Sequence, residues 1–477
     1  MNLLIKKQNK IKFLLFTFLI SFIYRSTLYY FQIFDTWGLT DDSLEYINIA
    51  KSIKEFGIIG ENGEPGMNRT PGYPFFIYFS FLFSENLNSI IFTQFFIDSL
   101  SCVLIMDIAS GLKISNKLKY FLSFLLISCL YTTIYSGLIM TETLYCFLIT
   151  LSFWIIFKNH NKKEFFFDLP NYNLIFLSFV YAAIIYVRPI FSLILLITFI
   201  IFFCIDLFNS KNFNLKIISK YFIISSMVLI FLSPWILRNN IVFKKYYELP
   251  NNDIITPIGF KSNINKWKVI YNKNYQKFVK SYNEPLLILN PIEKPKVYKS
   301  VYNGENKDID QAFRLLQKIP DIRYGVSNYP IKYPEEMNNK FLEISEKRYQ
   351  HSPSLYFTAP LSRIAKILFA PRISSFYKNK SGFNSNKITF IFYTIYNLIY
   401  TLPSIILCAF GIIFFKKYRY NKIFLYSFSL IIGHLYVYTS WVPLTQSRYL
   451  IPMFPILSLL SIIFFNKLYL NVNKYFK

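Results

Sequence analysis

The sequence predicts an all-α polytopic membrane protein with about 10 (10–13) transmembrane helices. Hydrophobic residues make up 53% of the 477 residues and charged residues only 16%, which is little charge for the surface of a soluble protein. The apolar residues also fall in runs of about twenty, the length of a helix that crosses the hydrocarbon core. Because lipid offers the backbone no hydrogen-bond partners, these runs are expected to be helical.

Ten runs qualify as spans, with boundaries that hold to a few residues. The short apolar segment PFFIYFSFLF after Gly72 is instead expected to be re-entrant or interfacial. The first run is too long for the apolar part of a cleavable signal and lacks a small-residue cleavage site. The ten expected spans are 11–31, 88–109, 119–136, 139–157, 173–187, 189–208, 219–237, 386–415, 423–441 and 450–466.

Lysine and arginine residues gather in alternate connections, and the positive-inside rule assigns those connections to the cytoplasm. Both termini are then cytoplasmic, in a multi-pass protein of the cytoplasmic (inner) membrane. Six segments agree on this topology: Lys6–Lys12, Lys113–Lys119, Lys158–Lys163, Lys211–Lys220, Lys416–Lys422 and Lys467–Lys477.

Three regions follow from this topology. Residues 1–237 form an N-terminal transmembrane module whose first outer loop, 32–87, carries juxtamembrane helices. Residues 238–385 form a larger extracytoplasmic insertion, in which 335–369 reads as a helix kinked at Pro353 and continued by an amphipathic stretch on the membrane. Residues 386–477 hold the last helices.

Composition and motifs exclude several classes of function. The formal net charge of +26 does not indicate nucleic-acid binding, because the lysines are spread over loops that flank the membrane. There is no phosphate-binding P-loop, dinucleotide-binding glycine motif or zinc-ligand spacing. The five cysteines all lie inside apolar segments and read as small hydrophobic residues.

The polar stretch TDDSLEYINIAKSIKEFGIIGENGEPGMNRTPGYP, residues 40–74, is the first candidate site. Asp42 and Glu45 resemble a capping box at the start of a helix. The same helix would present Asp42, Glu45 and Tyr46 on one face, where Asp42 beside Asp41 could act as a general base. In RTPGYP, Arg69 is either part of a rigid turn or a ligand for phosphate, since a guanidinium donates hydrogen bonds in pairs.

Further charges are expected at the outer ends of spans. Glu142 in MTETLYC either helps to start its helix or needs a basic partner from elsewhere. Arg188, Arg238 and Arg448 each lie beside a proline or a Trp-Pro pair. Snorkelling towards the interface is the common use of such arginines, but three on one face, opposite acids, indicate an anionic ligand of lipid character.

Asp98 and His434 are ionisable residues that lie within expected spans. Such residues are functional candidates by default. Hydrogen bonding to a neighbouring helix is the preferred interpretation for both.

Six motifs follow one another along the chain: DSLEYINIA, RTPGYP, TETLY, VRP, SPWILRN and SRYLIPMFP. In this order they resemble the GT-C superfamily of membrane glycosyltransferases, and most closely the branch of protein O-mannosyltransferases and the lipid A aminoarabinose transferase. The segment RYQHSPSLYFTAPLSRIAKILF resembles that branch's outer-face helix, whereas residues 246–334 match nothing. The chain departs from the family where Arg69-Thr70-Pro71 replaces a Lys-Pro-Pro run and where Gln446-Ser447 replaces an acid.

The resemblance implies an inverting transferase that moves a hexosyl or pentosyl group from a polyprenyl-phosphate donor on the outer face of the membrane. The acceptor would be a hydroxyl or phosphate of a lipid, glycan or protein of the cell envelope, as in lipopolysaccharide or protein O-glycosylation. No nucleic acid takes part, no cofactor is assigned, and a divalent metal is left open, although no metal ligand is predicted.

The resemblance also assigns roles to residues. Asp42 would be the catalytic base with Asp41 beside it, and Glu142 would be the second acid. Arg69, Arg238, Arg448 and Arg188 are the candidates for the donor phosphate. Tyr46 and Tyr73, which lie in the matching motifs, are the expected substrate contacts.

Alternatives from other classes are a flippase or transporter of lipid-linked saccharides and a polymerase or ligase of surface polysaccharide. A flippase should carry cations along its spans in both leaflets, whereas the basic candidates here gather at the outer ends. A non-catalytic scaffold would not require acids opposite arginines on one face.

Overall fold

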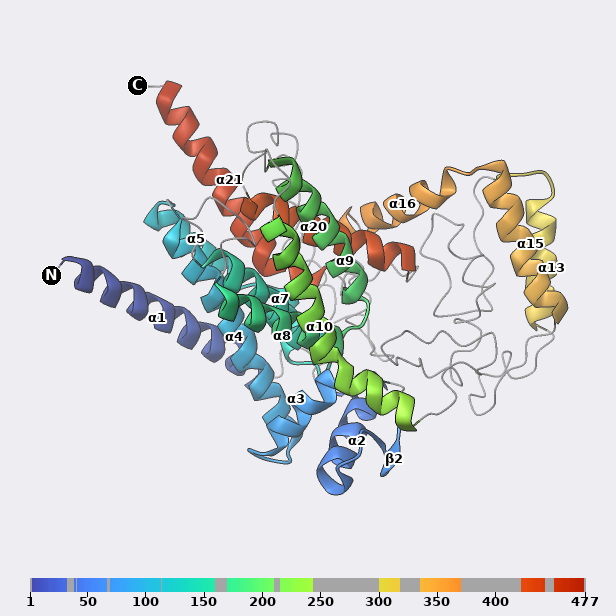
Figure 1. Cartoon of the computed structure of the whole chain (residues 1–477), viewed down its shortest axis with the longest axis horizontal. Coiled ribbons are helices and arrows are strands. Elements are labelled where there is room, and N and C mark those ends of the chain that lie inside the picture. Colours follow the sequence, from blue (N-terminus) through green and yellow to red (C-terminus); the bar gives the residue numbers. More distant parts are fainter. Residues whose placement is uncertain are drawn as a thin grey trace.

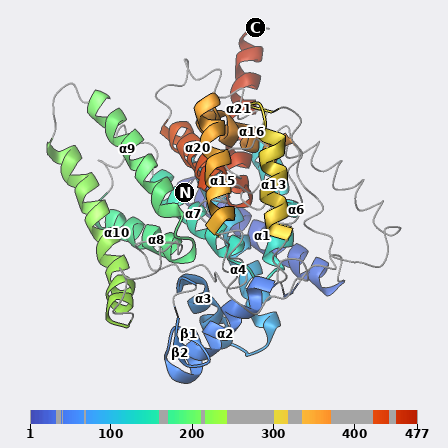
Figure 2. The ribbon, with the colours of Figure 1, turned by 90° about the vertical axis from the view of Figure 1, so that its right-hand side faces the viewer.

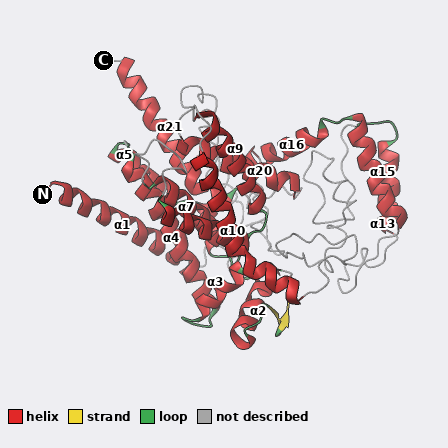
Figure 3. Cartoon of the chain, in the orientation of Figure 1, coloured by secondary structure: helices red, strands yellow, loops and turns green. Residues whose placement is uncertain are grey.

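The architecture was analysed in a computed structural model of the whole chain (Figure 1). The structure describes residues 2–31, 38–39, 41–66, 69–112, 114–158, 170–209, 215–242, 300–317, 335–369, 422–441 and 450–475. The expected span 386–415 and the site residue Arg448 lie outside these ranges. Nearly all of the described chain is helical (Figure 3).

The described apolar helices confirm a helical membrane protein. Four segments are long and apolar enough to cross a membrane: Gln8–Tyr30, Leu87–Gly111, Asn116–Ser136 and Ile218–Val242. The expected total of about ten spans therefore stays a prediction. The helices are α1 (Asn2–Tyr30), α4 (Leu87–Gly111), α5 (Asn116–Ile127), α6 (Leu130–Ser136), α7 (Thr141–Phe157), α8 (Asn171–Val187), α9 (Phe191–Asn209), α10 (Leu215–Val242), α20 (Lys422–Trp441) and α21 (Phe454–Tyr475).

Two of the expected spans are interrupted. The span expected at 119–136 consists of α5 and α6, which are separated at Ser128 and Cys129. The last span begins with a 3₁₀ turn, Ile451–Met453, before α21. Pro455, at the start of α21, has no N–H to bond to the Ile451 carbonyl four residues earlier, which accounts for the irregular start.

The polar segments lie away from the chain ends (Figure 1). After α1 come α2 (Asp41–Phe56), a hairpin of β1 (Gly60–Glu61) and β2 (Glu64–Pro65), and α3 (Gly72–Phe81). The hairpin turns through Asn62 and Gly63, both with positive φ. With 10 residues, α3 spans only about 15 Å and is too short to cross a membrane.

The insertion contributes α13 (Glu305–Gln317), α15 (Glu335–His351) and α16 (Leu355–Phe369). The break between α15 and α16 falls at Pro353, as the sequence predicts. Figure 2 shows α13 and α15 side by side, and Phe313 packs edge-on against Phe341 between them. Buried Arg348 pairs with buried Glu305, so this unit has its own small core with an ion pair inside it.

A buried ion pair joins α1 to α4. Arg25 Nε lies 2.6 Å from Asp98 Oδ2, and both side chains are almost fully buried. Arg25 Nη1 also donates to the Ser21 carbonyl at 3.1 Å. Asp98 therefore bonds to a neighbouring helix, as expected, but its partner is a cation inside the first span that the sequence analysis did not single out.

Asp98→Ala should destabilise the protein by about 3–5 kcal/mol, because it leaves the Arg25 guanidinium buried without its counter-charge. The double variant Arg25→Leu/Asp98→Leu should recover most of that loss. Thermal unfolding of the purified protein in detergent tests both. A single variant as stable as the parent would contradict this role of the pair.

A candidate acid–arginine site at the outer helix ends

The first outer segment is fastened to the turn between α6 and α7. The Gly38 amide donates to the Gly137 carbonyl at 3.0 Å, and the Ile139 amide donates back to the Gly38 carbonyl at 3.1 Å. At the start of α2, Ser43 Oγ donates to the Ile139 carbonyl at 2.8 Å. Two segments about 100 residues apart in sequence are thus held together, which brings α2 to the N-terminus of α7.

Arg69 is held by one face of α2. Its Nη2 lies 2.9 Å from Asp42 Oδ1 and 2.8 Å from Glu45 Oε2, and its Nε donates to the same Glu45 oxygen at 2.9 Å. Its Nη1 donates to the Tyr46 hydroxyl at 3.3 Å, and the guanidinium lies over the Tyr46 ring. The helical spacing places these three residues on one face of α2, where together they bind the Arg69 guanidinium.

Asp42 does not cap the helix. Because α2 begins at Asp41, Asp42 lies inside the first turn, and its carboxylate accepts from Arg69. The Asp42 side chain is 45% exposed, whereas that of Glu45 is 14% exposed. Of these two acids, Asp42 is therefore the one that a substrate can approach. The side chain of Asp41 lies outside what the structure describes.

Gln94 connects this cluster to the α6–α7 turn. The Tyr73 hydroxyl donates to Gln94 Oε1 at 2.7 Å, and Gln94 Nε2 donates to the carbonyls of Ser136 and Leu138 at 2.9 and 2.7 Å. Tyr73 in turn meets the Tyr46 ring edge-on at 5.0 Å. Fully buried Gln94, which no sequence motif marked, thus orients the Tyr73 side chain.

Glycine at position 72 permits a close helix contact. A Cβ atom there would lie 2.7 Å from the backbone of Tyr186, at the end of α8. Only glycine fits at this distance. The contact places the start of α3 against the backbone of the residues directly before Arg188. The expected turn is therefore confined to the residues before Gly72, because Gly72, Tyr73 and Pro74 begin α3 and Gly72 does not have a positive φ.

A second pair, Glu142 with Arg188, lies at the start of α7. Arg188 Nη2 lies 2.5 Å from Glu142 Oε1, and the Glu142 carboxylate is fully buried. Arg188 Nε donates to Thr141 Oγ1 at 2.9 Å and Nη1 to the Tyr438 hydroxyl at 3.2 Å. The structure thus supplies the basic partner that Glu142 required.

Arg238 reaches the loop that carries Arg69. Its Nη2 donates to the Ile59 carbonyl at 2.7 Å and its Nη1 to the Gly66 carbonyl at 2.9 Å. Gly66 is three residues before Arg69, so the end of α10 supports the β-hairpin beside the first pair. The sequence did not indicate this contact, which spans 172 residues.

The electrostatics link the two pairs. Burial lowers the pKa of the Arg69 guanidinium, but Tyr46, Glu45 and Asp42 outweigh burial and the net shift is upwards. Burial raises the pKa of Tyr46, with Arg69 and Arg188 lowering it and Asp42 and Glu142 raising it. Tyr46 is therefore within electrostatic range of both acid–arginine pairs. Arg69 stays protonated at any physiological pH.

The site can supply an accessible carboxylate next to a fixed positive charge. Such an arrangement suits proton abstraction beside an anionic group. Within the described residues there is no cluster of three or more histidine, cysteine or acidic side chains that could hold a metal ion. His434, on α20, lies 3.4 Å from the Tyr145 hydroxyl and packs against Tyr438, which agrees with its expected role inside the bundle.

Fold and site together define a helical membrane protein with acid–arginine pairs at the ends of its helices. No family model and no curated protein sequence matches the chain. The chain is similar to two solved structures of ArnT from Cupriavidus metallidurans, "in the apo state" and "bound to Undecaprenyl phosphate", with TM-scores of 0.37 and 0.35. Each match is 10% identical and covers 95% of this chain and 77% of ArnT.

ArnT is a lipid A aminoarabinose transferase of the GT-C superfamily, the branch that the motifs resemble. An identity of 10% and TM-scores below 0.5 establish neither the activity nor the ligands of this chain.

Gln94→Leu should lower the stability of the outer segment. The substitution leaves the Tyr73 hydroxyl and the carbonyls of Ser136 and Leu138 without their partner, at about 1–3 kcal/mol for each buried group. Thermal unfolding measures the loss, with Thr93→Val, one residue earlier on α4, as the control. Equal unfolding temperatures for the two variants would show that Gln94 does not hold this junction.

Proposed function

We propose that the protein is a glycosyltransferase that moves a sugar from a polyprenyl-phosphate donor to an acceptor on the outer face of the membrane, with inversion at the anomeric carbon. The observation that carries the proposal is the 45% exposed Asp42 carboxylate held against Arg69, at the end of a bundle of membrane helices. The ordered motifs that resemble the GT-C superfamily add to it.

In this proposal Asp42 is the general base. The acceptor oxygen attacks the anomeric carbon, its proton passes to the Asp42 carboxylate, and the bond from that carbon to the phosphate oxygen breaks. The polyprenyl phosphate leaves with the electron pair. Arg69 orients the Asp42 carboxylate through the hydrogen bond from its Nη2.

The leaving phosphate needs positive charge rather than a proton. Arg69 and Arg238 lie on either side of the same hairpin loop and are the first candidates, with Arg188 and Arg448 as further ones. Arg69 already contacts two carboxylates, so a phosphate there would share the guanidinium with Asp42 and Glu45. The acceptors of Arg238 named above are neutral carbonyl oxygens, which compete less with a phosphate.

Glu142 acts in this proposal through Arg188. A carboxylate with no exposed surface does not meet a substrate in this conformation, but it fixes the position and charge of Arg188. Tyr46, which is partly exposed, is proposed to border the bound sugar. Tyr73 is fully buried in this conformation, so its proposed part in substrate binding is to support the Tyr46 ring, which it meets edge-on. Glu142 is therefore a positioning residue.

The buried position of Arg25, a cation within a described span, does not favour a flippase. Arg25 lies within α1, but its charge is neutralised by Asp98 at 2.6 Å. A pathway for a lipid-linked anion needs cations that the anion can reach. The acids and arginines of the candidate site instead gather around α2 and the ends of α7, α8 and α10.

Asp42→Asn should lower the rate of sugar transfer by roughly 10²–10⁴, the usual contribution of a general base. Membranes incubated with radiolabelled polyprenyl-phosphate hexoses and pentoses provide the assay, and the labelled product identifies the acceptor class. Glu45→Gln is the matched control on the same helix face and should lose less activity. Near-normal transfer by correctly folded Asp42→Asn protein would rule out the base.

The proposed outer location of α13 is tested by cysteine labelling. Asn303→Cys should react with a membrane-impermeant maleimide in intact cells, because Asn303 is exposed in the insertion. Lys117→Cys, exposed at the start of α5, should react only after the cells are opened. The unsubstituted protein gives the background from its own cysteines. The reverse pattern would invert the proposed topology.

A further inference from the structure

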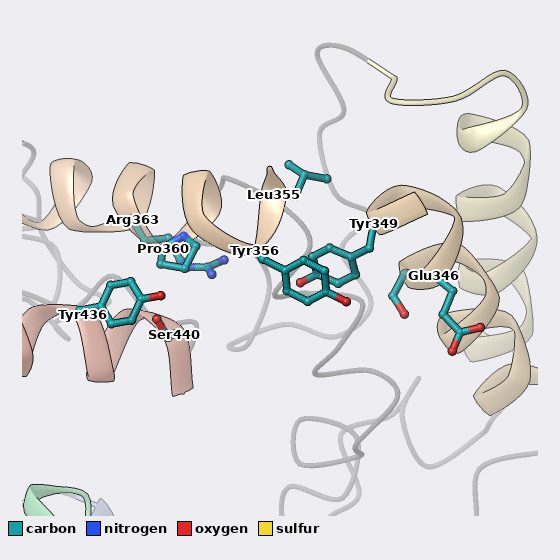
Figure 4. Close-up of a pocket in the computed structure, with 9 residues that line it drawn as sticks. Glu346, Tyr349, Leu355, Tyr356, Pro360, Arg363, Tyr436 and Ser440 are labelled. Atoms are coloured by element: carbon teal, nitrogen blue, oxygen red, sulfur yellow. The ribbon is translucent and has the colours of Figure 1, made fainter. Parts of the chain in front are cut away.

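A cavity of about 330 Å³ lies between α15, α16 and the end of α20, outside the acid–arginine site (Figure 4). This volume is at the lower end of the range for small-molecule pockets. Its lining is unusually rich in hydroxyl groups and includes one cation and one acid. The lining residues are Ser345, Glu346, Tyr349, Leu355, Tyr356, Pro360, Arg363, Tyr436 and Ser440.

The cation of this cavity is buried. Arg363 on α16 is 1% exposed, and its Nε donates to the Thr439 carbonyl at 2.9 Å. Burial lowers the pKa of the guanidinium, Tyr349 opposes this shift, and the net pKa is about 10. A negative charge that entered the cavity would therefore be stabilised beside Arg363, since it would offset the cost of burying the cation.

Ser440 supplies the second observation. Its Oγ is buried and makes no hydrogen bond within the described structure, although it lines the cavity. A buried hydroxyl without a partner costs free energy that a hydrogen-bonding ligand would recover. In Figure 4, Ser440 and Tyr436 lie on α20 below Arg363 on α16, so the three groups face one region.

The other end of the cavity carries a different chemistry. The Tyr349 and Tyr356 rings are stacked, with centroids 3.9 Å apart. Glu346, on α15, lies beyond them, away from Arg363 (Figure 4). The Glu346 carboxylate repels a simple anion at this end, whereas sugar hydroxyls can donate to it and an apolar sugar face can pack on the tyrosine rings.

We propose that this cavity binds an acidic sugar, with the carboxylate or phosphate of the sugar at Arg363 and Ser440 and its hydroxyls towards Glu346. As part of the acceptor glycan, which rests on the proposed transferase function, such a sugar would lie across α20 from the Glu142–Arg188 pair. Positions 436 and 440 share one face of this helix, and Tyr438 on another face contacts Arg188.

Direct binding tests the site without any donor sugar. The full chain is placed in nanodiscs of phosphatidylcholine, and glucuronic acid, glucose 6-phosphate, glucose and inorganic phosphate are titrated by calorimetry. The two acidic sugars should bind saturably, and at least tenfold more tightly than neutral glucose or inorganic phosphate. Because each binding curve is independent of transfer, an inactive Asp42→Asn protein should still bind them.

Variants localise the binding. Arg363→Gln should weaken it about tenfold or more, as expected for a lost charged hydrogen bond, and Ser440→Ala should weaken it several-fold. Ser440→Ala removes a hydroxyl without a partner, so folding should be retained. Arg314→Gln, an exposed arginine on α13 outside the cavity, is the matched control and should bind as the parent does.

Three results would overturn the proposal. They are the absence of saturable binding by both acidic sugars, binding that neither Arg363→Gln nor Ser440→Ala weakens, and inorganic phosphate binding as tightly as the sugars, which would indicate a plain anion site. Loss of sugar binding in nanodiscs that contain phosphatidylglycerol, with binding retained in pure phosphatidylcholine, would assign the cavity to a lipid headgroup instead.

Discussion

The attachment of the first outer segment to the α6–α7 turn is the constraint on which the site depends. Gly38 exchanges backbone hydrogen bonds with Gly137 and Ile139, and Ser43 adds a third bond at the start of α2. Helix α2 also packs on α3, but this junction is what ties it directly to the segment before α7. With it, the Asp42–Arg69 pair is set next to the start of α7, where Glu142 and Arg188 are already held by buried contacts.

The two acid–arginine pairs differ in how much of the carboxylate remains exposed to solvent. Glu142 has lost all contact with solvent, and its charge is balanced by an arginine that is itself tied to α20 through Tyr438. Asp42 keeps nearly half of its surface, although it too faces an arginine. A buried pair is costly to separate, whereas a half-exposed pair can exchange one partner for a substrate. The same chemical groups therefore give one rigid support and one reactive carboxylate.

The sequence predicted the helices well where apolar surface alone decides the structure. The break between α15 and α16 was also predictable, because Pro353 cannot continue a helix. The partners of the charged residues were not predictable, since Arg25 with Asp98 and Arg188 with Glu142 meet only after helices pack. The role of Gln94 was not predictable either, because a single glutamine in an apolar run gives no periodic signal. In the structure its side chain bonds both to Tyr73 and to the carbonyl of Ser136 at the end of α6. The interruption at Ser128 and Cys129 has no proline or glycine to mark it.

Helix α20 is the element through which the outer insertion can influence the acid–arginine pairs. Tyr438 on one face receives a hydrogen bond from Arg188, and the carbonyl of Thr439, the next residue, accepts from Arg363 of α16. A ligand that draws Arg363 away from that carbonyl alters the last turn of α20, where the Tyr438 hydroxyl also lies. Because Arg188 neutralises a fully buried carboxylate, even a small displacement of Tyr438 changes the hydrogen bonding of the Glu142–Arg188 pair. The cavity and the Glu142–Arg188 pair are therefore connected through two adjacent residues of α20, Tyr438 and Thr439.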